Sequence, residues 1–292
     1  MDCKIKMQEK NIGIVADEAI DLGDDLAKEH DISLVRFKLD IGDLGKYPGN
    51  IYEKMRASEK AGETKFVKTS QPSINDFAKA FNEKLKEYKE IICFTISSKV
   101  SGTYNSAIQA KKFLSKELSE KVHIFDTLNG SAGEGLTVLK AVELIKQNLQ
   151  TKEILNILSN NLKNITLVGV YENGKWLEAS GRIPKFIHKG AERMGITPIF
   201  GFKDGKLKIV ALKKVKELSA LLFEEFNKKA DFNKKIAAGI THADDLPEAN
   251  KLKELLISKN INVAFCSLVC LPIGRAHWSW SISSFLEPRI NI

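Results

Sequence analysis

The sequence predicts an α/β protein in which a Rossmann-like parallel-sheet domain precedes an α+β domain with a mixed sheet. In the first half, short apolar runs alternate with amphipathic helical segments, which is typical of a parallel sheet covered on both faces. Near Thr151 the pattern changes, and Asp204-Gly205 between two β-rich runs predicts a hairpin. A chain of 292 residues is long enough for two hydrophobic cores. We place the domains at 9–150 and 151–292.

The strands expected in the first half are short apolar runs, predicted at 11–16, 33–39, 90–96 and 122–126. Leu22 and Leu26 indicate a short helix, for which Asp21 is the expected cap. Further helices are predicted at 51–57, at 103–114 and from the loop at 130–133 to residue 148. The clearest helix follows residue 73, where apolar residues recur at intervals of three and four. These residues are Ile74, Phe77, Ala78, Phe81, Leu85 and Tyr88.

The second half combines a hairpin with helical crossovers, which favours a mixed sheet. Its expected helices are 151–162, 215–228 and 247–256, and its expected strands are 165–171, 199–202, 207–212, 235–241 and 262–268.

The charge of the chain is basic but dispersed. There are 45 Lys and Arg residues against 37 Asp and Glu residues, a formal net charge of +8. The lysines are interspersed with glutamates, as in 83–87, and no basic stripe with interleaved aromatic residues is present. We therefore expect no nucleic-acid binding. The excess charge is compatible with transient contact with an acidic protein or an anionic membrane surface.

The sequence favours a cytoplasmic protein with reduced cysteines. It contains no run of about 18 apolar residues, and its first ten residues are polar and charged. Cys3, Cys93, Cys266 and Cys270 do not form a disulfide framework or a zinc-binding spacing. We expect no metal and no cofactor. His242 with Asp244 and Asp245 has the residue types of a metal site, but an Asp-rich helix N-terminus is the simpler explanation.

Two hydroxyl-rich loops, 68–73 and 97–104, are the most informative feature of the sequence. Each follows an extended segment and opens a predicted helix. Hydroxyls and free N–H groups at two helix N-termini form a receptor for a carboxylate or a phosphate. Ser and Thr before helices are often only caps, with Pro72 and Gly102 as ordinary turn residues. Asp17 and Asp126 also follow strand ends, where ligands bind in parallel sheets.

At these loops the chain resembles the DegV family, which includes the fatty-acid-binding subunits of bacterial fatty acid kinase. The signature segments are Thr69-Ser70-Gln71-Pro72-Ser73 and Ser98-Lys99-Val100-Ser101-Gly102-Thr103-Tyr104. The other matches are Asp17 with Asp21, Asp126-Thr127 followed by Gly133 and Gly135, Gly181-Arg182-Ile183-Pro184-Lys185, Ile196-Thr197-Pro198-Ile199, Asp204-Gly205 and His242-Ala243-Asp244-Asp245. Glu18 replaces a serine of the family's opening loop. The resemblance extends from about Asn11 to Pro288.

The resemblance implies a non-catalytic carrier that holds one long-chain fatty acid between two domains. Thr69 and Ser101 match the residues that hold the carboxylate. A separate kinase subunit would phosphorylate that carboxylate with ATP, and the acyl phosphate would enter phospholipid synthesis. Residues expected around the head group are Ser70, Ser98, Gly102, Thr103, Asp126, Arg182 and His277.

One segment departs from the family, which has a C-terminal Gly-x-His-x-Gly-Pro-Gly loop. Here residues 276–281 read Ala-His-Trp-Ser-Trp-Ser. These residues can be encoded as GCA CAC TGG TCC TGG AGC, and a shift of one base gives His-Thr-Gly-Pro-Gly followed by an alanine codon. We hypothesise a local frameshift within 274–284, which resequencing of the gene would test.

Two other functions remain open from the residues. In the first, the protein is a hydrolase with Ser101 as nucleophile and His242 or His277 as base, although no Gly-x-Ser-x-Gly segment is present. In the second, the helix N-termini bind the phosphate of a polar metabolite.

Overall fold

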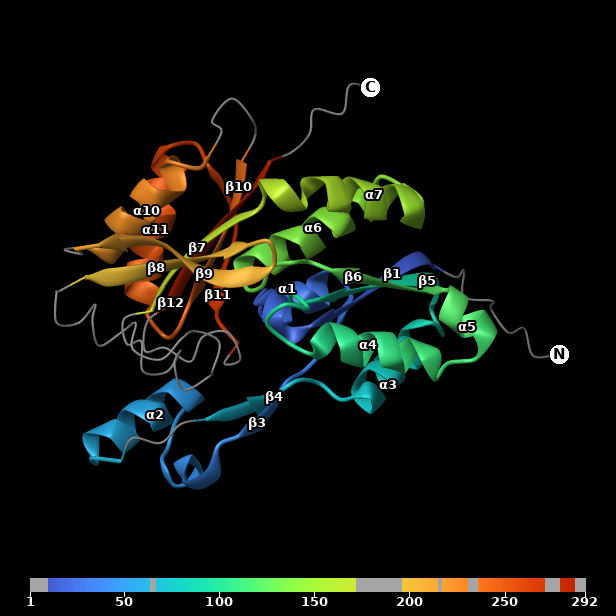
Figure 1. Cartoon of the computed structure of the whole chain (residues 1–292), viewed down its shortest axis with the longest axis horizontal. Helices are drawn as coiled ribbons and strands as arrows, with labels where there is room; N and C mark the ends of the chain where they lie inside the picture. Colours follow the sequence, from blue (N-terminus) through green and yellow to red (C-terminus); the bar gives the residue numbers. More distant parts are fainter. Residues whose placement is uncertain are drawn as a thin grey trace.

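In the computed structural model of the protein, the residues described are 10–63, 67–171, 196–214, 217–230, 236–270 and 279–286. Two sheets, each with helices packed on it, lie side by side, and a small lobe containing helix α2 projects below the second sheet (Figure 1). The α/β class predicted from the sequence, with a parallel first sheet and a mixed second sheet, is confirmed.

The first sheet is entirely parallel. Its strands are β1 (Lys10–Asp17), β2 (Ile32–Val35), β5 (Tyr88–Thr95) and β6 (Val122–Asp126), in the order β2-β1-β5-β6. All four strands therefore end at one edge, where the second hydroxyl loop (97–104) follows β5 and where β6 ends at Asp126.

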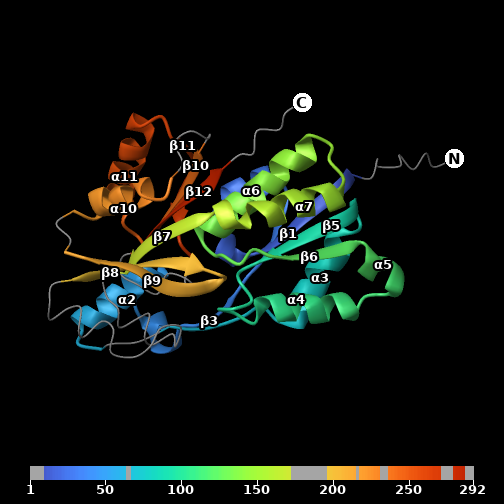
Figure 2. The ribbon, with the colours of Figure 1, turned by 45° about the horizontal axis from the view of Figure 1, so that its top comes forward.

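Alternation of apolar residues along the strands gives the first sheet two buried faces. In β5, Ile92 and Phe94 belong to one core, and Ile91 and Cys93 belong to the other. Side chains on a strand point alternately to opposite faces, so a continuous apolar run supplies both cores. Helices α6 and α7 cover one face, and α3 and α4 cover the other (Figure 2).

The helices and 3-10 turns around the first sheet have defined bounds. They are η1 (Glu18–Ile20), α1 (Asp24–Glu29), α3 (Ile74–Lys84), α4 (Thr103–Lys112), α5 (Lys116–Glu120), α6 (Ala132–Lys146), α7 (Thr151–Asn161) and η3 (Leu162–Asn164). The apolar residues Ile154 and Leu158 of α7 pack in the same core as α6. By its packing, α7 thus belongs with the first sheet.

The second sheet has six strands in the order β11-β10-β12-β7-β8-β9. They are β7 (Thr166–Tyr171), β8 (Thr197–Lys203), β9 (Lys206–Lys213), β10 (Ile236–His242), β11 (Asn262–Leu268) and β12 (Ser279–Leu286). The pair β10–β11 is parallel, and the other pairs are antiparallel. Helices α10 (Leu218–Asn227) and α11 (Leu246–Ser258) pack on this sheet through apolar side chains.

The second sheet contains the hairpin that was expected from the sequence and one strand that was not. The hairpin at Asp204-Gly205 is confirmed, and both turn residues have positive φ angles of 53° and 76°. Residues 279–284, expected to belong to an altered loop, instead lie in β12, which pairs with β10 and β7. A strand at this place was missed.

The small lobe divides the predicted strand 33–39. The first part of that predicted strand lies in β2 of the first sheet. The second part forms β3 (Lys38–Asp40), which pairs with β4 (Lys68–Ser70) in a two-stranded ribbon outside both large sheets. The lobe also holds η2 (Gly42–Lys46) and α2 (Ile51–Lys60), packed around Leu44, Met55 and Val67. Tyr52 Oη donates to the Val269 carbonyl at 2.7 Å, which ties the lobe to the chain after β11.

Candidate functional site

The first hydroxyl loop joins the β3–β4 ribbon to helix α3. Ser73 is the N-cap of α3: its Oγ accepts from Asp76 N at 3.2 Å, and Asp76 Oδ2 accepts from Ser73 N at 2.8 Å. This reciprocal capping explains Ser73 structurally. Thr69 is half-buried in β4, and the neighbouring Ser70 is exposed. Neither residue is needed to cap the helix.

The second hydroxyl loop leads from β5 into helix α4. Ser101 Oγ lies 2.8 Å from Thr103 Oγ1 and accepts from Thr103 N at 3.3 Å. Thr103 is buried, whereas Ser101 is half-buried. The pair places a partly accessible hydroxyl at the N-terminus of a ten-residue helix, where the helix dipole favours a negative charge.

Gln71 connects the two loops. Its Nε2 donates to the Gly102 carbonyl at 3.2 Å and to Ser106 Oγ at 2.8 Å. Thr69 and Ser101, the two candidate ligands, thus come from segments that this amide holds together, although they are not hydrogen-bonded to each other. Sequence reasoning did not single out Gln71, because nothing in a linear pattern shows that its amide crosses to another loop.

Other residues expected near the head group have structural partners. Asp126 Oδ1 accepts from Ser98 N at 3.2 Å and from Leu128 N at 3.0 Å, so the aspartate fixes the second loop to the loop after β6. Ser97 Oγ donates to the Gly205 carbonyl at 2.6 Å, which joins the second loop to the β8–β9 turn. Arg182 and His277, also expected near the head group, lie outside the described residues.

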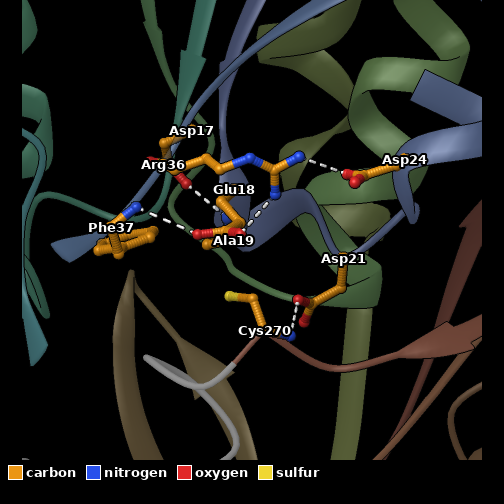
Figure 3. Close-up of polar contacts among 8 residues, drawn as sticks. All are labelled: Asp17, Glu18, Ala19, Asp21, Asp24, Arg36, Phe37 and Cys270. Carbon is orange, nitrogen blue, oxygen red and sulfur yellow. Dashed lines mark hydrogen bonds and ion pairs between the residues drawn. The ribbon is translucent and has the colours of Figure 1, made fainter. Parts of the chain in front are cut away.

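The opening loop after β1 is held by ionic and backbone contacts (Figure 3). Glu18, which stands where the family has serine, accepts from Arg36 Nη1 at 2.7 Å and from Phe37 N at 3.1 Å. Arg36 also donates to Asp24 at 2.6 Å. Glu18 therefore connects the loop after β1 to the segment after β2.

Asp17 and Asp21 are buried carboxyls in the same loop. Asp17 accepts from Ala19 N at 2.8 Å and from Ile96 N at 2.7 Å. Asp21 is not the cap of α1, contrary to the sequence prediction: Gly23 holds that position, and Asp21 Oδ1 accepts from Cys270 N at 2.5 Å. Burial raises the pKa of each carboxyl to about 7.

Glu134, in the first turn of α6, is a third buried carboxyl that the sequence analysis did not identify. Among the residues that the structure describes, neither of its carboxylate oxygens has a hydrogen-bond partner. Burial, reinforced by the negative charges of Asp17, Asp21 and Asp126, raises the pKa of Glu134 well above its usual range. Burial therefore favours the protonated form of this acid.

Among the described residues, the arrangement around Ser101 does not resemble a hydrolytic triad; His277, the other base considered, lies outside them. The hydrogen bonds of Ser101 to described residues go to Thr103, and none goes to His242. Burial lowers the pKa of His242.

Within the described ranges, no group of three His, Cys, Asp or Glu side chains could hold a metal ion. The described helices include none that is long and apolar enough to cross a bilayer.

The fold and the two joined loops define a two-domain α/β protein with a candidate anion-binding site beside its parallel sheet. A model of the DegV family, described as uncharacterised, matches residues 11–277. The chain belongs to the DegV family.

Individual relatives agree with this assignment. The chain is 31% identical over 232 residues to a fatty acid-binding protein of Thermotoga maritima, covering 77% of this chain and 76% of that protein. It is 34% identical over 190 residues to a DegV domain-containing protein of Staphylococcus aureus, covering 65% and 67%.

Solved structures share the fold at lower identity. A fatty-acid-binding DegV protein of Thermus thermophilus has a TM-score of 0.81 at 22% identity, over 95% of this chain and 100% of that one. A stearic acid-binding protein of Eubacterium ventriosum has a TM-score of 0.80 at 19% identity, over 96% and 98%.

Proposed function

We propose that the protein binds one long-chain fatty acid between its two domains and presents the carboxylate to a separate kinase subunit, which forms an acyl phosphate. The family assignment and the fatty-acid-binding relatives support the choice of ligand. The observation that carries the proposal is the Gln71 cross-link, because it joins the loops of Thr69 and Ser101.

The head group is held by neutral donors in this proposal. Thr69 and Ser101 supply hydroxyls, and the N-terminus of α4 supplies a favourable dipole. A carboxylate held by hydroxyls keeps more of its nucleophilicity than one paired with a buried cation. Such a site suits a carboxylate that must attack the γ-phosphate of ATP.

The tail supplies the affinity. An acyl chain of about sixteen carbons, at roughly 0.8 kcal/mol per buried CH₂, offers ~12 kcal/mol of gross transfer free energy. The loss of translational freedom and the ordering of the tail reduce this considerably. The hydroxyls therefore orient the carboxylate, while burial of the tail retains the ligand.

The surroundings of the loops leave access for a second protein. Gln71 and Ser106 line an open groove together with Pro72, Ile74 and Phe113. The side chain of Phe113 is 77% exposed. In this proposal the protein is a non-catalytic carrier that works in the cytoplasm and collects its ligand during transient contact with a membrane.

Native mass spectrometry of the protein purified from bacteria tests the ligand class. A co-purifying long-chain fatty acid supports the proposal, and a phosphorylated polar metabolite would instead favour the alternative phosphate site. Thr69→Ala and Ser101→Ala should each weaken fatty-acid retention by about two- to tenfold, the effect of losing one hydrogen bond. Ser115→Ala is the matched control, since Ser115 caps the distant helix α5. Unchanged retention in the double variant of Thr69 and Ser101 would refute the clamp.

The kinase step needs its own test. Purified protein loaded with fatty acid, ATP and the fatty acid kinase catalytic subunit from the same bacterium should give acyl phosphate. Product formed equally well in the absence of this protein would contradict its role as carrier.

A further inference from the structure

Gln71 is anchored at two points on the second loop and its helix. Its Nε2 donates hydrogen bonds to the Gly102 carbonyl at 3.2 Å and to Ser106 Oγ at 2.8 Å. Gly102 directly follows Ser101, and Ser106 is buried in the first turns of α4. One exposed amide therefore connects the first loop to both the backbone and a side chain of the second.

Gly102 is required by this contact rather than by its backbone conformation. Its φ of −79° and ψ of 4° are accessible to any residue. A Cβ at this position would lie 2.1 Å from Gln71 Oε1 and 2.8 Å from Gln71 Cδ. The glycine leaves the space that the Gln71 amide occupies, and any side chain there would displace the amide.

Few other contacts fix the position of Thr69. The β3–β4 ribbon that carries Thr69 belongs to neither large sheet, and all three residues of β3 are exposed. The Ser73 capping box holds the far end of the loop to α3. Between β4 and Ser73, the hydrogen bonds of Gln71 connect the first hydroxyl loop to the chain beside Ser101.

We propose that Gln71 is a positioning residue of the fatty-acid site, which sets the separation of the Thr69 and Ser101 hydroxyls, and that Gly102 serves this role by making room for it. The inference rests on the proposed function for its ligand. Gln71 acts through the two loops, so its loss reduces recognition of the carboxylate while leaving burial of the tail intact.

The closing experiment compares two ligands that differ only in the head group. Dissociation constants are measured for palmitic acid and for hexadecanol, which has the same chain length but no carboxylate, with delipidated protein. Gln71→Ala should weaken binding of the acid by about two- to tenfold relative to the alcohol. Ser106→Ala should produce a smaller loss of the same kind. Gln109→Ala is the matched control, since Gln109 lies on the same helix and bonds to Asn105.

A double-mutant cycle tests the role of Gly102. Gly102→Ala alone should reduce the preference for the acid as much as Gln71→Ala does, because it displaces the amide. In the Gln71→Ala background, Gly102→Ala should have no further effect. The same cycle, read from chemical unfolding of the ligand-free variants, measures the coupling between the two residues without reference to any ligand.

Each outcome has a distinct meaning. The proposal is supported if the effects of Gln71→Ala and Gly102→Ala on the free energy of unfolding are non-additive and the preference for the acid is lost. Additive effects on stability would overturn the contact itself. Non-additive stability with an unchanged acid-to-alcohol ratio would overturn the positioning role. If the wild-type protein bound neither ligand, the proposed function would fail and the positioning role with it, while the stability cycle would still report the contact.

Discussion

Ser97 of the first domain donates its hydroxyl proton to the carbonyl of Gly205 in the second, with 2.6 Å between the oxygens. Both residues are buried, and Gly205 has a φ of 76° at the turn between β8 and β9. The loop that carries Ser101 is therefore fixed to the hairpin of the other domain.

Removal of that hydroxyl should destabilise the protein. Ser97→Ala leaves a buried carbonyl without its donor, which typically costs about 1–3 kcal/mol in the free energy of unfolding. Urea unfolding monitored by circular dichroism measures the change, and Ser159→Ala, at an exposed position inside α7, is the control. A loss no larger in Ser97→Ala than in the control would show that the interdomain bond does not contribute.

The buried carboxyls make stability depend on pH. Because burial raises the pKa of Asp21 to about 7 from 3.8, the folded state retains a proton that the unfolded state releases between these values. The contribution of Asp21 is thus complete below the lower pKa and is lost as pH rises through about 7, with a slope of at most about 1.4 kcal/mol per pH unit.

Asp21→Asn isolates this contribution, since the amide oxygen can still accept from Cys270 N. Between about pH 5 and about pH 8, the free energy of unfolding measured with urea should fall less in the variant than in the wild type. Asp25→Asn, at an exposed position of α1, should leave the wild-type difference unchanged. An identical pH dependence in Asp21→Asn and the wild type would contradict the raised pKa.

Glu134→Gln should stabilise the protein at alkaline pH. The wild-type carboxyl must remain protonated in its buried, unpartnered position, which becomes more costly as pH rises. The gain should be larger at about pH 8 than at about pH 5, because the raised pKa makes ionisation of the buried carboxyl costlier as pH rises. Glu120→Gln, at an exposed helix end, is the control. Equal destabilisation at both pH values would mean that the carboxyl makes a favourable contact.

Glu18→Ser, which restores the residue typical of the family, should cost more than Arg36→Gln. Both changes remove the partly exposed ion pair between Arg36 and Glu18, worth about 0.2–1 kcal/mol, and Arg36→Gln also removes the more exposed pair with Asp24, which contributes little. Only Glu18→Ser also removes the acceptor for Phe37 N, worth about 1 kcal/mol. Thermal unfolding of both single variants tests the order. The reverse order would show that the backbone contact is unimportant.

The hydrophobic pattern was sufficient to predict most of the fold, because strand and helix periods are local properties. The strand 262–268 has the bounds expected from the sequence, and the 74–84 helix buries Phe77 and Phe81 as the pattern requires. Strand β12 was missed although Ser279-Trp280-Ser281-Ile282 alternates polar and apolar residues.

The site was less accessible to prediction than the fold. The two hydroxyl loops could be identified because Ser, Thr, Pro and Gly mark helix starts. The role of Gln71 depends on a contact over 31 positions, and the burial of Glu134 depends on neighbours from several segments. Such contacts exist only in the folded chain, so a linear pattern does not reveal them.

The place of β12 in the second sheet orders events during synthesis. Residues 279–286 insert between β10 and β7, so every other strand of that sheet is synthesised before the strand that joins its two parts. The first sheet is complete by residue 126 and is free to form while translation continues. A nascent chain stopped before residue 279 would hold two separate fragments, β10–β11 and β7–β8–β9, each with an open edge prone to aggregation.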